Sequence, residues 1–316
     1  MLNTYRVVPF DPQYGSSTQQ NGSTLPFLLP SLVMSSIVVP SSTAPLQDDV
    51  YSLLRERIDL RAQLFDAVQI QRKLSGPRAL RHGDLQFASE VFAARFLSGD
   101  FTTFSQDGSR VLAVLGDIAG KGVAAAMWFT HLAGLLQSYG RPDFDPGRIA
   151  REMNRHLCYL QPVAPFVTAF FAQIDCDLGA ITYCNAGHFP PILLRRDGRT
   201  ELLEDGGPLL GALEGAEFQS GELMLEPGDT LVAYSDGVLE CRNTGGEEFG
   251  LDRLMASLLD ARQQSAQATL MTLLGAVQDF ANGIPLLDDV SLTLIQRDMG
   301  HPPFAREREA CPQQLV

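Results

Sequence analysis

Hydrophobic and polar positions divide the chain into stretches with different periods. Residues 1–45 are rich in Ser, Thr, Pro, Gln and Asn and keep no period, which is typical of a flexible tail. Between residues 47 and 74 apolar positions recur about every 3.5 residues, which predicts one long amphipathic helix. The apolar seam consists of Val50, Leu53, Leu60, Leu64, Ala67 and Leu74, with Arg57 and Gln71 as polar interruptions. Two interpretations stay open: a short parallel coiled coil that would form a homodimer, or a helix packed on its own domain.

Strand-like and helix-like runs alternate in blocks through the rest of the chain. Residues 111–115 are apolar at every position, which predicts a strand covered on both faces. Helical spacing follows in consecutive pairs, at 122–139 with 146–160, and at 251–263 with 266–281. Further strand-like runs cover 87–97, 166–175, 180–185, 191–196, 200–203, 222–225, 230–235 and 290–296. Helix pairs between hairpin-rich blocks favour an α+β fold, a four-layer α-β-β-α sandwich of two antiparallel sheets flanked by helices.

Composition narrows the classes of function. The 316 residues carry 24 basic and 37 acidic side chains, a net charge of −13, which argues against nonspecific nucleic-acid binding. The sequence contains no uninterrupted run of about 18 apolar residues, so it predicts no membrane-spanning helix. The five cysteines are odd in number and form no CxxC pair, so a reduced, cytoplasmic protein is the simpler expectation.

Aspartates stand where predicted strands end or begin. Asp100 follows Gly99, Asp117 closes the apolar run, Asp236 follows the strand at 230–235, and the pair at 288–289 precedes the last strand. Each alone is an ordinary turn residue, but two carboxylates about 4 Å apart repel by roughly 4 kcal/mol. If they converge, a cation must lie between them, and oxygen ligands favour Mg²⁺ or Mn²⁺. Two such ions can activate water for hydrolysis of a phosphate ester. Residues 116–122 do not match a Walker A loop, because only three residues separate the first Gly from the Gly-Lys pair and that motif needs four.

Five segments carry a family resemblance. They are QIQRKL (69–74), GDIAGKG (116–122), NAGHFPPILL (185–194), GDTLVAYSDGVLECRN (228–243) and DDVSLTLI (288–295). In this order they resemble the PPM-type serine/threonine phosphatases of the stage II sporulation E and RsbU group, over about residues 65–298. The resemblance implies a regulatory helix at 46–80, a phosphatase domain at 81–300 and a flexible tail at 301–316.

The resemblance also implies roles for single residues. Asp117 would bridge two divalent metal ions, Mn²⁺ or Mg²⁺, and the backbone carbonyl of Ile118 would reach the second. Asp236 and Asp288 would complete the first metal, and Asp100 would help to hold the second, directly or through water. The nucleophile would be a water bridging both ions, so Asp117 and Asp236 would be catalytic through it.

Three further residues have two interpretations each, and a fourth, Thr103, departs from the family pattern. Asp289 could replace Asp288 as a ligand, although the family motif favours the first position of the pair. Lys121 could touch the substrate phosphate or only flank a helix. His188 could act as a general acid or only shape a strand connection. Thr103 stands where the family usually has an acid, and this could weaken the outer shell of the second metal.

The resemblance implies hydrolysis of phosphoserine or phosphothreonine on a protein. The substrate would be an anti-sigma-factor antagonist-like signalling protein in a bacterial partner-switching pathway. A catalytically silent module that keeps the fold and sequesters a partner is the alternative. Hydrolysis of a small phosphorylated metabolite is a third hypothesis.

Overall fold

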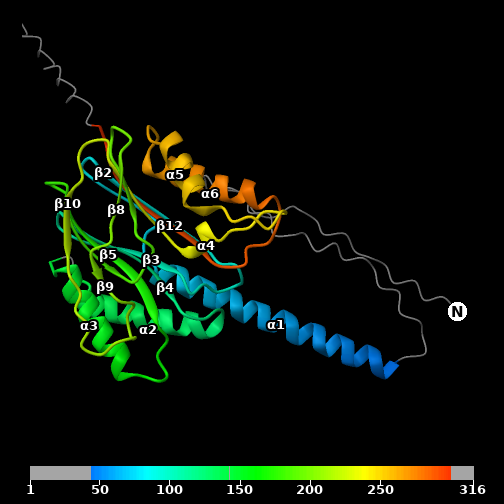
Figure 1. Cartoon of the computed structure of the whole chain (residues 1–316). Helices are drawn as coiled ribbons and strands as arrows, with labels where there is room; N and C mark the ends of the chain where they lie inside the picture. The colour runs from blue at the N-terminus through cyan, green and yellow to red at the C-terminus, as the bar shows by residue number, and fades with distance from the viewer. Residues whose placement is uncertain (1–43, 142, 300–316) are drawn as a thin grey trace, which may run out of the picture. The chain divides into compact units, whose positions relative to one another are not determined.

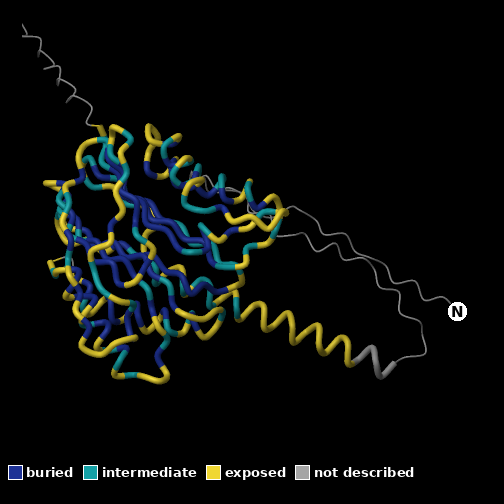
Figure 2. Tube along the Cα trace, viewed as in Figure 1, coloured by how far each residue is buried: buried dark blue, intermediate teal, exposed yellow. Residues whose placement is uncertain are grey.

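The computed structural model describes residues 44–141 and 143–299 (Figure 1). The chain divides into two units, residues 1–53 and 54–316, and helix α1 (Ala44–Leu74) begins in the first and ends in the second. The helix predicted at 47–74 is therefore confirmed. The tails expected at 1–45 and 301–316 lie almost wholly outside the described residues. Along α1 the seam residue Leu60 and its neighbours Ile58 and Phe65 are exposed (Figure 2).

Sheet A has six strands in the order β1-β2-β12-β11-β7-β8, and all of its pairs are antiparallel. The strands are β1 (Ala79–His82), β2 (Leu85–Phe92), β12 (Val290–Arg297), β11 (Thr230–Tyr234), β7 (Ile192–Leu194) and β8 (Thr200–Leu202). The last strand of the chain, β12, lies inside the sheet between β2 and β11.

Sheet B has the order β10-β6-β5-β4-β3, again antiparallel. Its strands are β10 (Gly221–Met224), β6 (Ala180–Ala186), β5 (Val167–Asp175), β4 (Arg110–Ile118) and β3 (Phe101–Asp107). A short sixth strand, β9 (Gly206–Gly207), pairs in parallel with β6 and departs from the expected antiparallel pattern. The strands β1, β3 and β9 were not predicted.

Two helix pairs cover the outer faces of the sheets (Figure 1). Helices α2 (Val123–Tyr139) and α3 (Pro146–Tyr159) pack on sheet B, and α5 (Gly250–Asp260) and α6 (Ala266–Ala281) pack on sheet A. A one-turn helix, α4 (Asp236–Leu239), follows β11. Asp145 caps α3 by accepting a hydrogen bond from the Arg148 amide at 2.9 Å, with Pro146 in the first turn.

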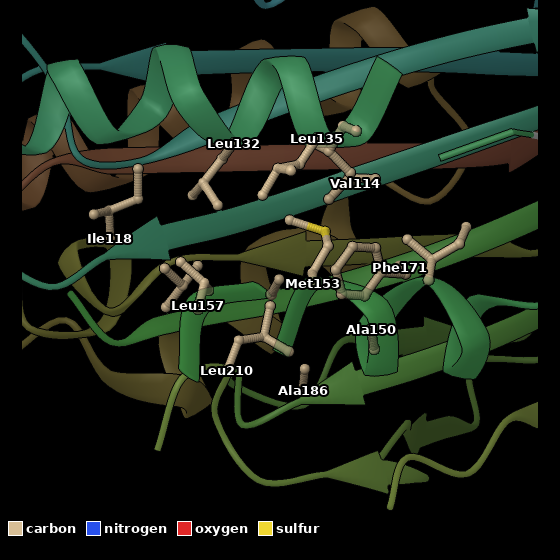
Figure 3. Packing of buried hydrophobic residues seen from close by; sticks show 14 of the residues in the cluster. Val114, Ile118, Leu132, Leu135, Ala150, Met153, Leu157, Phe171, Ala186 and Leu210 are labelled. Atoms are coloured by element: carbon tan, nitrogen blue, oxygen red, sulfur yellow. The ribbon is translucent and has the colours of Figure 1, made fainter. Parts of the chain in front are cut away.

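Strand β4 explains why the layers form. Val111, Ala113 and Leu115 pack into the core between the two sheets, whereas Leu112 and Val114 pack under α2 and α3 (Figure 3). Because successive side chains of a strand point to opposite faces, a strand apolar at every position must be covered on both. The four-layer α-β-β-α fold predicted from the sequence is confirmed.

No helix within residues 44–141 and 143–299 combines the length and apolar character that a membrane crossing requires.

Candidate metal centre

The strand register places the predicted aspartates at one end of each sheet. In sheet B, Phe101 pairs with Gly116, so Asp100 and Asp117 lie next to each other just beyond that pair. In sheet A, Tyr234 pairs with Leu292, so Asp236 lies at the same end as Asp288 and Asp289. Antiparallel pairing thus gathers residues far apart in sequence into two small groups.

Hydrogen bonds join the two groups across the sheets. The hydroxyl of Ser291 on β12 donates to Asp100 Oδ2 at 2.8 Å. Asp289 Oδ2 accepts from the hydroxyl of Ser98 and from the amide of Gly99, each at 2.8 Å. We call Asp100, Asp117, Asp236, Asp288 and Asp289 together the carboxylate site.

The carboxylate site concentrates negative charge in a partly dry environment. Burial and the neighbouring Asp236 raise the pKa of Asp117 from 3.8 to about 6. Burial and then Asp117 hold the pKa of Asp100 well above its usual range, and burial followed by Asp288 raises the pKa of Asp236. Raised pKa values in a group of acids mean that the ionised forms repel one another and lack water. A bound cation would relieve both costs.

Lys121 supplies one cation at the edge of the carboxylate site. Its Nζ lies 2.5 Å from Asp288 Oδ2 and donates to the carbonyl of Leu287 at 3.1 Å. The hydrogen bond to Asp288 raises the pKa of Lys121. The structure brings Lys121 against a carboxylate, a contact that neither of its two interpretations included.

Two glycines allow the backbone to approach the carboxylates closely. A Cβ on Gly237 would lie 2.0 Å from the carbonyl oxygen of Asp289, which is too close for any side chain to fit there. A Cβ on Gly99 would lie 3.0 Å from the carbonyl oxygen of Ile118 and 3.4 Å from Asp117 Oδ1. The Ile118 carbonyl oxygen and Asp117 Oδ1 therefore both lie against Gly99.

The chemistry of the donors fits a hard divalent cation. Carboxylates and a backbone carbonyl are the oxygen ligands that Mg²⁺ and Mn²⁺ prefer. Within the described part of the chain, no three His, Cys, Asp or Glu side chains already form a closed ligand set. Asp100 is turned to Ser291 and Asp288 to Lys121, so a metal ion would have to replace these partners.

Asp289 is used differently from Asp288. Its Oδ1 accepts from the Ala94 amide at 2.7 Å, and its Oδ2 is shared between Ser98 and Gly99. It is buried, with 8% of its surface exposed. Both oxygens therefore hold the 94–99 segment, which supports Asp288 as the ligand of the pair.

His188 is buried and neutral. Its Nδ1 lies 2.9 Å from Thr168 Oγ1, its amide donates to Asn185 Oδ1 at 2.7 Å, and burial lowers its pKa to about 4. These contacts support the interpretation that it shapes the strand connection. Thr103 lies on β3 opposite Val114, three residues beyond Asp100.

The sequence reasoning missed the residues that position the site. The side chain of Gln71 on α1 contacts Ser98 twice: its Nε2 donates to the Ser98 carbonyl at 2.7 Å, and its Oε1 accepts from the Ser98 amide at 3.3 Å. Ser98 in turn binds Asp289. Two signals in the sequence pointed to Gln71: it interrupts an apolar seam, and it lies in QIQRKL (69–74), one of the segments that carry the family resemblance.

The family profile described as Stage II sporulation protein E (SpoIIE) matches residues 107–298, more than half of the chain. The chain belongs to the SpoIIE family. The fold and the motifs thus place it among the PPM phosphatases of the SpoIIE and RsbU group, as the resemblance implied.

Relatives of known name support the SpoIIE assignment. Phosphoserine phosphatase RsbU of Bacillus subtilis is 26% identical over 242 residues, which cover 76% of this chain and 71% of RsbU. Phosphoserine phosphatase RsbP of the same organism is 30% identical over 190 residues, 58% of this chain and 47% of RsbP. The chain thus spans less than half the length of RsbP.

Solved structures share the fold. The SiaA-PP2C domain of Pseudomonas aeruginosa superimposes with a TM-score of 0.67 at 18% identity, covering 77% of this chain and 99% of that domain. The phosphatase domain of SpoIIE from Bacillus subtilis with a fragment of its regulatory domain gives a TM-score of 0.59 at 17% identity, covering 70% of this chain and 64% of that one.

Proposed function

We propose that this protein hydrolyses phosphoserine or phosphothreonine on a protein substrate with the help of divalent metal ions. The observation that carries the proposal is the carboxylate site, where five acids from two sheets meet in the family's motifs and burial raises the pKa of Asp100, Asp117 and Asp236. The relatives named as phosphoserine phosphatases support the same reaction class.

The residues divide the work as follows. Asp117 and the Ile118 carbonyl, at the end of β4, would hold both Mn²⁺ or Mg²⁺ ions. Asp236 and Asp288 hold one of them from sheet A, and Asp100 holds the other from sheet B. A fold neighbour, RsbX, is described in complex with magnesium, which is consistent with this donor set. When bound, two such ions lower the pKa of water and neutralise the charge of the phosphoryl group.

Lys121 takes part in forming the site. Because its ammonium lies against Asp288, it compensates part of the negative charge before metal binds. A metal ion bound at Asp288 would compete with Lys121 for that carboxylate, and the released ammonium would be available to a phosphate group. Its ion pair is half exposed, so the contact costs little to break.

The relatives support a substrate class. We propose a phosphorylated anti-sigma-factor antagonist-like protein, in a cytoplasmic partner-switching pathway, acted on by a catalytic domain at 81–300. The segment at 46–80, whose helix α1 ends at Leu74, regulates this domain through the contact between Gln71 and Ser98. Homodimer formation through residues 47–74 belongs to the same proposal, since Leu60 and other apolar side chains of this helix are exposed.

The test is phosphate release from phosphorylated candidate proteins with Mn²⁺, measured for the wild type, Asp236→Asn and the control Asp107→Asn. Asp107 is exposed at the far end of β3. We expect Asp236→Asn to lose activity by at least a hundredfold and Asp107→Asn to keep it. Activity of Asp236→Asn near that of the wild type would contradict the proposal, and release only from small phosphorylated metabolites would replace the substrate class.

The alternative of a silent binding module makes a different prediction for metal affinity. A module that only sequesters a partner needs no metal, so calorimetric titration with millimolar Mn²⁺ would give no heat of binding. All the acids expected to be ligands are present and gathered, which favours the enzyme.

A further inference from the structure

Two histidines meet on the outer helices, away from the carboxylate site. His131 on α2 and His156 on α3 lie with their Nε2 atoms 3.0 Å apart and their ring centroids 5.1 Å apart. His131 is exposed and His156 is half-buried. The two rings are tilted by 32° to each other, and their Nε2 atoms face each other across this short distance.

The distance between the two nitrogens matches that of two ligands of one metal ion. Nitrogens about 2.0–2.1 Å from a common ion lie about 2.9 Å apart when the ligands are at a right angle and about 3.4 Å apart in a tetrahedron. The observed 3.0 Å falls within this interval. A small rotation of either ring suffices to admit an ion, because both side chains lie at the surface.

The groups around the pair leave its charge balanced. Glu152 lies one helical turn before His156 and pairs with Arg155 at 2.5 Å, so one acid and one base flank the rings. Burial, His131 and Arg155 lower the pKa of His156, which favours the neutral form that binds metal ions. Trp128 packs edge-on against His131 with ring centroids 5.5 Å apart, on the turn of α2 before it.

We propose that His131 and His156 form a second metal site, which takes an imidazole-binding transition metal such as Zn²⁺ or Ni²⁺ and joins α2 to α3. Imidazole nitrogens suit these ions, whereas Mg²⁺ and Mn²⁺ prefer oxygen, so the two sites select different metals. The remaining positions on the ion are filled by water. Because α2 starts at Val123, directly after the loop that carries Lys121, an ion here also fixes the helix that leads away from the carboxylate site.

A hydrogen bond between two neutral rings would also bring the nitrogens to this distance. In that case one ring donates its N–H and the other accepts, and metal ions have no special affinity for the pair. The experiment must therefore separate a ligand pair from a hydrogen-bonded pair.

The single tryptophan of the chain makes the site directly observable. Trp128 is the only one among 316 residues, and it contacts His131, so Ni²⁺ bound to the pair quenches the whole tryptophan signal. We would titrate the full chain with Ni²⁺ in millimolar Mg²⁺ and follow the fluorescence, then add Zn²⁺ as a competitor. The same titration would use His131→Gln, His156→Gln and the control His82→Gln, since glutamine keeps a hydrogen-bonding side chain but is a poor metal ligand.

We expect saturable quenching with one ion per chain, recovery on addition of Zn²⁺, and at least a tenfold loss of affinity in each of the two variants but not in the control. Zn²⁺ should also raise the unfolding midpoint of the wild type and leave that of both variants unchanged. Absence of quenching, or wild-type affinity in either variant, would overturn the proposal and leave a hydrogen-bonded pair. Circular dichroism establishes that the variants are folded.

Discussion

Replacing Asp117 by Asn tests whether the carboxylate site stores repulsion that a metal ion relieves. The pKa of Asp117 is raised from 3.8 to about 6, and one pKa unit corresponds to about 1.36 kcal/mol. The ionised form therefore destabilises the metal-free fold by up to about 3 kcal/mol. Because the folded pKa lies above the ordinary value, this cost is small below about pH 4, grows between about pH 4 and 6, and is fully present above pH 6. Asn has nearly the same shape and no charge.

We expect metal-free Asp117→Asn to be more stable than the wild type by about 1–3 kcal/mol at pH 7 and about equal at pH 4. Urea unfolding in EDTA at pH 4, 5.5 and 7 measures this, with Asp107→Asn as the control for an exposed acid. Addition of Mn²⁺ should reverse the order, because only the wild type gains stability from the ion. A variant that is less stable than the wild type at pH 7 without metal would refute the reasoning.

Two further substitutions test how the site is positioned. Gln71→Ala removes both contacts with Ser98 and should lower phosphatase activity several-fold and the free energy of unfolding by about 1 kcal/mol. The control Gln63→Ala, at an exposed position on the same helix, should change neither quantity. Equal effects of the two substitutions would contradict a positioning role for Gln71. Gly237→Ala should prevent formation of the native site, because its Cβ would lie 2.0 Å from a carbonyl oxygen. Gly275→Ala in α6, where a Cβ meets nothing within 4 Å, should instead raise the unfolding midpoint. A soluble Gly237→Ala protein with wild-type metal affinity would show that the backbone can move aside.

Local patterns predicted the layers of the fold well. The continuous apolar run of β4 required cover on both faces, and the consecutive helices supplied it. Strand β3 was not predicted because Phe101 and Phe104 are three residues apart and break the alternation expected of a strand. The apolar run at 87–97 was longer than the strand it contains, which ends at Phe92, because the residues after it turn toward Asp289.

The candidate site could be predicted only in part, for a related reason. The sequence shows that an aspartate stands at the end of a predicted strand, and the pairing of that strand with its neighbours then determines which other residues lie beside it. Which acid holds the backbone is set by contacts between distant segments, as with Asp289 and Ser98. The contact of Gln71 with Ser98 also joins distant segments, so the sequence showed a polar residue in an apolar seam and in a family motif but not its partner.

The position of β12 has a consequence for how the protein folds during its synthesis on the ribosome. This strand is the last of the described elements, yet it lies inside sheet A, and the hydroxyl of Ser98 meets Asp289 across 191 positions of sequence. At a synthesis rate of about 5–20 residues per second, about 10–40 s pass between the synthesis of Asp100 and that of Ser291, its hydrogen-bond partner on β12. A nascent chain therefore has no assembled carboxylate site, and a phosphatase built this way stays inactive until nearly all of its domain has emerged.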